Sequence, residues 1–190
     1  MTAIRSLRKL IVAAGFAVLL AGCATNTVVP LRYQTSTQAG QTCSRGITLL
    51  PLADKRSDTI TIGSLGEGKS FYPENDVSEW VSWALFEELK ARGCDVKYRE
   101  KTDTSALKGY VVSGSFDTVN VNTGTAMMAK AKLRVRVKVE KDGQFVQEQI
   151  YSGERENLGL TYVDAAQKVL SSTLQYILQD AATDVVKATK

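Results

Sequence analysis

The sequence predicts an α+β protein in which one mixed, mostly antiparallel sheet carries two helices packed on one face. Three observations support this fold class. Two segments place apolar residues at helical spacing behind a capping residue, and five other segments have the composition of strands. Their order along the chain is β-α-β-β-β-β-α, which favours a layer of helices on a single sheet. The chain of 190 residues is long enough to bury one core.

The first strand is predicted over residues 46–53, a short apolar run with β-branched members. Pro51 places this strand near an edge of the sheet or at a strand end, because proline has no backbone N–H to donate. The polar, glycine-containing segment Asp54–Asn75 is predicted to be a loop. A loop of this length indicates a functional or mobile segment.

The first helix is predicted to begin after Asp76, which forms a capping-box pattern with Glu79, and to end at Gly93. Its buried stripe is formed by apolar residues at helical spacing: Val77, Trp80, Val81, Ala84, Leu85 and Leu89. Trp83 and Phe86 point away from that stripe. Either the Asp54–Asn75 loop covers these two aromatic rings, or they form an exposed apolar patch that a partner covers.

Three further strands follow a short one at residues 95–99, and they are predicted over residues 110–122, 128–141 and 144–155. The Asp142-Gly143 pair supplies the hairpin turn between the last two. The second helix begins behind Thr161, with Asp164 three residues on. The 128–141 strand alternates without a break, and its outer face carries five basic side chains: Lys130, Lys132, Arg134, Arg136 and Lys138.

These five basic side chains are a candidate surface for acidic lipid headgroups or for an acidic patch on a partner. The alternative, which we favour, is an ordinary solvated sheet face that lies across from Glu148 and other residues of the next strand.

The N-terminus has the pattern of an export signal. A basic region with Arg5, Arg8 and Lys9 precedes an apolar run from Leu10 to Leu20, which is too short to span a bilayer. The tetrapeptide that ends at Cys23, Leu-Ala-Gly-Cys, resembles the lipobox of bacterial lipoproteins, in which the cysteine is acylated and becomes the first residue. The alternative is an ordinary signal peptide with an incidental cysteine.

The lipobox resemblance divides the chain into three parts. Residues 1–22 are the signal peptide, 23–43 the lipidated N-terminus with a flexible tether, and 44–190 a single periplasmic α+β domain. Several acyl chains on Cys23 would hold the protein stably on a membrane. Ala24 is similar to the residue found after the cysteine in lipoproteins that are sorted to the outer membrane, and this resemblance implies the inner leaflet of that membrane.

Two cysteines remain in addition to Cys23. Cys43 lies just before the first predicted strand and Cys94 just before the second. Both strands of a right-handed βαβ unit begin at the same end of the sheet, so a disulfide between the two cysteines is expected in an exported protein. Two buried free thiols are the alternative.

Several features together resemble the YajG family of outer-membrane lipoproteins. They are Asp54 and Arg56 after the first strand, the helix end at Leu89–Gly93, the alternating strand that turns at Asp142-Gly143, and the C-terminal helix. The resemblance spans most of residues 46–187 and implies fold and location. The family has no agreed catalytic residues, so the resemblance implies no site.

Composition and motifs argue against nucleic-acid binding, nucleotide binding and the commonest kinds of catalytic and metal site. Loss of residues 1–22 removes three of the 24 basic residues and none of the 20 acidic ones, and the resulting net charge of +1 does not favour nucleic-acid binding. The chain has no histidine, which removes the usual catalytic triads and the commonest metal ligand. Residues 63–70 fit the P-loop pattern, but Pro73 follows and the helix begins only after Asp76, so we expect no nucleotide.

The sequence therefore predicts no enzyme, no cofactor and no metal. We expect a non-catalytic envelope protein that docks a protein partner in assembly or transport. The second hypothesis is a carrier of a small amphiphile or lipid between the helices and the sheet. A sizeable apolar cavity would favour the carrier, whereas a solid core with Trp83 and Phe86 exposed would favour docking.

Overall fold

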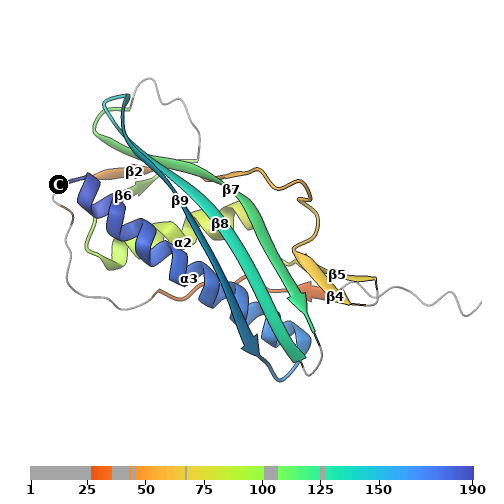
Figure 1. Ribbon diagram of the computed structural model, residues 1–190. Coiled ribbons are helices and arrows are strands. Elements are labelled where there is room, and N and C mark those ends of the chain that lie inside the picture. The colour runs from red at the N-terminus through yellow and green to blue at the C-terminus, as the bar shows by residue number, and fades with distance from the viewer. Residues whose placement is uncertain (1–26, 36–42, 44–45, 67, 101–106, 125–126) are drawn as a thin grey trace, which may run out of the picture.

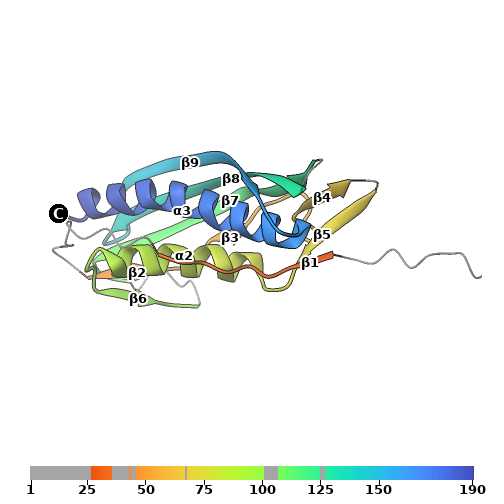
Figure 2. The ribbon, with the colours of Figure 1, turned by 90° about the horizontal axis from the view of Figure 1, so that it is seen from below.

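The structure is a computed structural model and describes residues 27–35, 43, 46–66, 68–100, 107–124 and 127–190. In that part of the chain, two helices, α2 (Val77–Ala91) and α3 (Tyr162–Ala188), pack on an open, mixed, nine-stranded sheet (Figures 1 and 2). The predicted α+β class is confirmed. The lipobox, Cys23 and the signal peptide lie outside the described residues.

Three long strands form the main antiparallel ladder: β7 (Tyr110–Thr123), β8 (Met128–Lys141) and β9 (Gln144–Leu158). The bounds of β8 are those predicted from its alternation. Its apolar side chains are buried toward α3, while its basic ones face outward. Asp142 (φ 53°) and Gly143 (φ 77°) form the turn into β9. Positive φ at both central residues is the conformation that a tight hairpin requires.

The predicted strand over residues 46–53 is divided into β2 (Ile47–Leu49) and β3 (Ala53–Asp54), both parallel to β7. The ladder is interrupted at Pro51 and Leu52, and side chains of α2 form hydrogen bonds with the backbone N–H and carbonyl of Leu52. Its N–H donates to Ser82 Oγ at 2.9 Å, and its carbonyl accepts from Ser78 Oγ at 2.6 Å. Helix hydroxyls thus satisfy the buried polar groups that a break in a strand exposes.

The prediction that Asp54–Asn75 is a loop is wrong over most of its second half. That half contains the hairpin of β4 (Gly63–Gly66) and β5 (Lys69–Pro73), and β4 also pairs with β7. Gly63 permits this pairing, because it has φ 142° and a Cβ there would lie 1.8 Å from the carbonyl oxygen of Val121. The P-loop-like motif of residues 63–70 is therefore a β-hairpin and does not lead into a helix.

The prediction that residues 23–43 form a flexible tether is wrong for residues 27–35. β1 (Thr27–Val29) pairs with β5 in parallel, and Val29 and Leu31 are buried in the core. From β1 the chain runs across the helical layer beside α2 (Figure 2). Residues 27–35 therefore belong to the folded domain.

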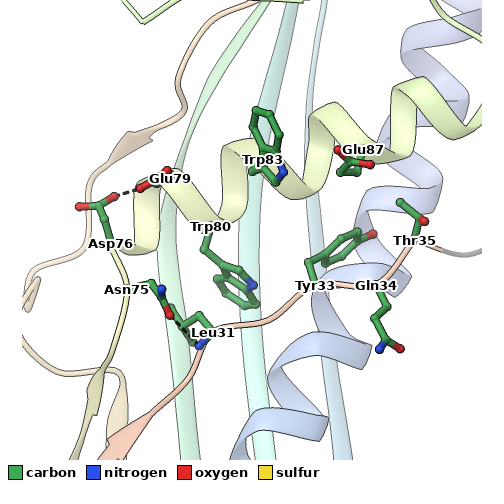
Figure 3. Close-up of a pocket in the computed structure, with 10 residues that line it drawn as sticks. All are labelled: Leu31, Tyr33, Gln34, Thr35, Asn75, Asp76, Glu79, Trp80, Trp83 and Glu87. Carbon is green, nitrogen blue, oxygen red and sulfur yellow. Dashed lines mark hydrogen bonds between the residues drawn. The ribbon is translucent and has the colours of Figure 1, made fainter.

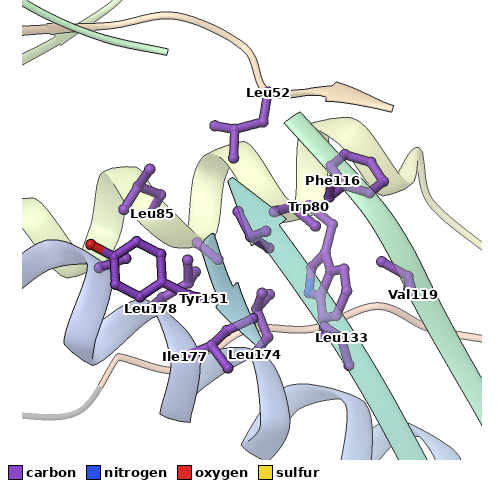
Figure 4. Close-up of a cluster of buried hydrophobic side chains, with 14 of the residues drawn as sticks. Leu52, Trp80, Leu85, Phe116, Val119, Leu133, Tyr151, Leu174, Ile177 and Leu178 are labelled. Carbon is purple, nitrogen blue, oxygen red and sulfur yellow. The ribbon is translucent and has the colours of Figure 1, made fainter. Parts of the chain in front are cut away.

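Both helices begin at the predicted caps. The side chain of Asp76 accepts from the N–H of Glu79 at 2.7 Å, and Thr161 Oγ1 accepts from the N–H of Asp164 at 3.1 Å. The space between helices and sheet is filled by side chains of the central core, which include Leu133 and Leu174 (Figure 4). β6 (Val96–Tyr98) completes the sheet as a parallel partner of β2.

Candidate functional site

An open groove of about 750 Å³ lies between the N-terminal segment and α2, and we call it the α2 groove (Figure 3). One wall is formed by residues 31–35, and the other by α2 together with the turn before it. The side chains that line it are those of Leu31, Tyr33, Gln34, Thr35, Asn75, Asp76, Glu79, Trp80, Trp83 and Glu87.

Hydrogen bonds hold the N-terminal wall in place on both sides. The N–H of Leu31 donates to Asn75 Oδ1 at 3.3 Å, and Gln175 Nε2 of α3 donates to the carbonyl of Gln34 at 3.0 Å. Between them, Tyr33 Oη donates to Glu88 Oε1 at 2.6 Å. The segment is thus fixed to both helices at this point in the fold.

Glu88 belongs to a buried ion pair beneath this wall. Arg92 Nη1 lies 2.6 Å from Glu88 Oε2, one helical turn away, and Arg92 Nη2 donates to the carbonyl of Gln179 in α3 at 2.9 Å. Burial, and next the hydrogen bond to the Glu88 carboxylate, raise the pKa of Tyr33 well above its usual range. The Tyr33 phenol therefore stays a neutral hydrogen-bond donor at physiological pH.

The aromatic residues of α2 divide into a buried ring and an exposed cluster. Trp80 is only 6 % exposed, and its Nε1 has no hydrogen-bond partner among the described residues. Trp83 is 48 % exposed and stacks on Phe86 with ring centroids 4.7 Å apart. The ring of Tyr98 meets both edge-on, at 5.9 and 6.3 Å.

Of the two alternatives for Trp83 and Phe86, cover by the Asp54–Asn75 segment is not what the structure shows, and an exposed patch agrees with the position of Trp83. Trp83 remains half exposed, and that segment pairs instead with β7 and β1. Phe86 is partly buried against the core, so the two predicted residues do form one cluster. Sequence reasoning missed Tyr98 as its third member and missed Tyr33 and Leu31 across the groove.

The electrostatics of the α2 groove are one-sided. Of the ten described residues that line it, three are acidic, namely Asp76, Glu79 and Glu87, and none is basic. This arrangement suits binding of an apolar or cationic group. Among the described residues, no cluster of three or more His, Cys, Asp or Glu is placed to hold a metal ion.

The five basic residues of β8 lie on the outer face of the sheet, as predicted, among acidic neighbours. Lys130 pairs with Glu154 and also lies 3.5 Å from Glu156, and the hydrogen bond to Glu154 raises the pKa of Lys130. Lys132 lies directly across from Glu154 in the β8–β9 register. The remaining ion pairs are Arg134–Asp117 at 3.6 Å, Arg136–Glu148 at 3.2 Å and Lys138–Glu140 at 2.7 Å. This geometry agrees with a solvated face of interleaved charges.

The predicted disulfide is confirmed. Cys43 and Cys94 are bonded, with their Cα atoms 4.7 Å apart. The strands that follow them, β2 and β6, are parallel neighbours, with Ile47 opposite Val96. The two cysteines thus meet at the common starting end of these strands, which is the reasoning that predicted the bond.

Comparison with known proteins supports the fold and does not identify a function. No family model and no curated protein matches the chain. Among solved structures, the chain is similar to protein XCC0632 from Xanthomonas campestris, which is described by family-model DUF330. The two share 9 % identity with a TM-score of 0.64, and the match covers 85 % of this chain and 95 % of that one. A second, uncharacterized protein matches with 7 % identity and a TM-score of 0.57 over 84 % and 99 % of the two chains. At these identities the likeness shows a shared fold, and the resemblance to YajG stays a prediction.

No helix in the described part of the chain is both long and apolar enough to cross a membrane.

Proposed function

We propose that this chain is a non-catalytic envelope lipoprotein, anchored to the outer membrane through Cys23, that docks a partner protein in the α2 groove. The observation that carries the docking role is the half-exposed Trp83, which stands beside an open groove with an acidic lining. Exposed tryptophans flanked by a groove are typical hot spots of protein interfaces.

The chemistry of the groove indicates what the partner presents. Trp83 offers apolar surface, and Glu79 and Glu87 lie one helical turn to either side of it on α2. An apolar side chain next to a lysine or arginine would fill this site, since the cation could meet one of the carboxylates and the indole ring of Trp83. We therefore expect a basic, partly apolar segment of the partner in the groove.

Packing favours docking over the carriage of a small amphiphile. Leu133, Leu174 and Ile177 are fully buried between the helices and the sheet, which is where the carrier hypothesis placed its ligand. The open groove lies instead outside that core, between residues 31–35 and α2 (Figure 3). Ligand sites that carry lipids enclose most of their ligand, whereas an open groove of this kind suits a protein segment.

Crosslinking in intact cells tests the docking role. A photo-crosslinking residue at Thr35, which is exposed in the groove, should capture one defined envelope protein, and the same residue at Phe145, which is 65 % exposed on β9, should not. Trp83→Ala should weaken affinity for that protein by about 30-fold, since a hot-spot residue contributes about 2 kcal/mol or more. Capture from both positions alike, or capture that Trp83→Ala leaves unchanged, would argue against the groove.

The anchor is tested separately. Cys23→Ser should release the protein from the membrane fraction into the soluble periplasmic fraction, because the acyl chains are lost. A variant that stays in the outer membrane after a salt wash would contradict lipidation as the anchor.

A further inference from the structure

We propose that one end of the domain rests on the lipid surface that holds Cys23 and inserts five side chains into it. This inference rests on the lipid anchor of the proposed function and is independent of the α2 groove. The five exposed side chains lie in, or border, the β7–β8 and β9–α3 connections, and we call them the apolar end: Met127, Met128, Leu158, Leu160 and Tyr162.

The apolar end is one contiguous surface built by two neighbouring connections. Met128 and Leu158 are opposite each other in the β8–β9 ladder, and the N–H of Gly159 donates to the carbonyl of Met127 at 3.3 Å. The N–H of Leu160 donates to Asp164 Oδ2 at 2.8 Å, which fixes the connection into α3. Leu158 is 60 % exposed and Leu160 is 85 % exposed, although both are large aliphatic side chains.

The lipid anchor lies within short reach of this end. Cys23 is four residues before Thr27, so the two Cα atoms are separated by at most about 14 Å. β1 begins at the end of the molecule where β9 ends and α3 begins, and the C-terminus lies at the other end (Figures 1 and 2). Chain length and the position of β1 together place the lipid surface close to the apolar end.

A second exposed apolar pair, Phe145 and Val146, cannot share this position. Phe145 lies 13 residues before Leu158 along β9, which at about 3.3 Å per residue puts it roughly 40 Å away. With a four-residue link to the anchor, the domain can present only one of its two ends to the membrane at a time. The end at which β1 begins is the one within reach of Cys23.

The composition of the apolar end suits a lipid surface better than a second protein. Methionine and leucine side chains can enter the boundary between headgroups and acyl chains, and a tyrosine places its hydroxyl at headgroup level. Charged residues close to this end are paired within the domain, Asp164 with Lys168 at 2.9 Å and Glu156 with Lys130 at 3.5 Å. Shallow insertion would place these pairs at headgroup level, where they stay hydrated, while the apolar side chains reach the boundary with the acyl chains.

The test uses the mature lipidated protein, reconstituted into vesicles of phosphatidylethanolamine and phosphatidylglycerol. Leu160→Cys and Phe145→Cys each add one reactive thiol, because Cys43 and Cys94 are bonded to each other and Cys23 is acylated. Both positions are exposed, so neither substitution should disturb the fold, and Phe145 serves as the matched control. An environment-sensitive fluorophore on each thiol reports contact with brominated lipids through quenching.

We expect the fluorophore at position 160 to emit at shorter wavelength and to be quenched by brominated lipid about threefold more than the fluorophore at 145. Equal quenching at the two positions would overturn this inference. Protection from a soluble quencher without lipid quenching would also overturn it, and would show contact between copies of the chain. Mass spectrometry of the reconstituted protein distinguishes failure of the anchor from failure of this inference. Absence of acyl chains on Cys23 would overturn both. An acylated protein whose fluorophore at position 160 stays in water would overturn the inference alone.

Discussion

The hydrogen bond from Tyr33 to Glu88 fixes one wall of the α2 groove, and Tyr33→Phe removes it without changing the shape of the ring. The donor lies 2.6 Å from a carboxylate that is fully buried, so the bond is charge-assisted and water cannot readily replace it. Loss of such a bond should lower the free energy of unfolding by about 1.5–3 kcal/mol. With a urea m-value of about 2 kcal/mol/M, the midpoint of unfolding should fall by roughly 1 M.

Part of this loss is expected to be local. Residues 31–35 form one edge of the helical layer, so they can open without unfolding the sheet. Amide hydrogen exchange should therefore accelerate first at Leu31 and its neighbours, and capture of the docked partner should fall with it. The matched control is Tyr151→Phe, which removes a bond from Tyr151 Oη to Asp184 Oδ2 of 3.1 Å far from the groove. This control should lower stability without affecting hydrogen exchange at Leu31.

Alkaline pH provides a second measurement on the same variant. Burial raises the pKa of Tyr33 in the folded state, so its contribution to stability is complete below the unfolded pKa of about 10 and is lost as pH rises above that value. Between pH 10 and 11, the free energy of unfolding of Tyr33→Phe should fall less than that of the unmodified protein, by about 1 kcal/mol. Unchanged urea midpoints and an unchanged alkaline slope would together refute the view that this bond holds the wall.

Three further predictions concern stability and can all be measured by urea unfolding. Cys94→Ser should cost about 4 kcal/mol, because the bond closes a loop with a sequence separation of 51 residues, and reduction of the unmodified protein should give a similar loss. Glu88→Gln and Arg92→Met should each lower the free energy of unfolding by about 3–5 kcal/mol, because each leaves the other partner of the ion pair buried without its counterpart. The double variant should lose much less than the sum of the two. Gly153→Ala should cost about 1–3 kcal/mol, because the added Cβ would lie 2.7 Å from Ile177 Cγ2, whereas Gly124→Ala, with open space around it, should change stability little.

The long elements were predictable from the sequence because their periodicity is strong. The unbroken alternation of 128–141 and the capping residues Asp76 and Thr161 define one strand and two helix starts to the residue. The short strands were not predictable, because their pairing depends on distant partners. β4 and β5 contain glycine, serine and proline, which favour a loop in isolation, and only the long edge of β7 and the fit of Gly63 against Val121 make them strands.

The candidate site was predictable only on its helical side. Trp83 and Phe86 stand out because they fall off the apolar stripe of a helix. The opposite wall belongs to a segment whose polar composition suggested a tether, and its contact with α2 joins Tyr33 to Glu88 across 55 positions of sequence. A local signal did exist, since Val28, Val29 and Leu31 interrupt the polar residues with a short apolar run. Apolar residues in a supposed linker indicate that part of it packs on the domain.

The position of that segment changes what the anchor does. A flexible tether of 21 residues would have an r.m.s. length of about 25 Å and would leave the domain free to turn. Because β1 begins four residues after Cys23, the proposed lipid anchor would instead hold the domain within about 14 Å of its attachment point. From the start of β1 the chain continues to Tyr33, six residues on, without leaving the domain, so the groove wall belongs to the same folded segment as β1. The α2 groove would therefore be presented at a roughly constant height, about 20 Å from β1's start, and a partner would meet it in a restricted orientation close to the inner leaflet.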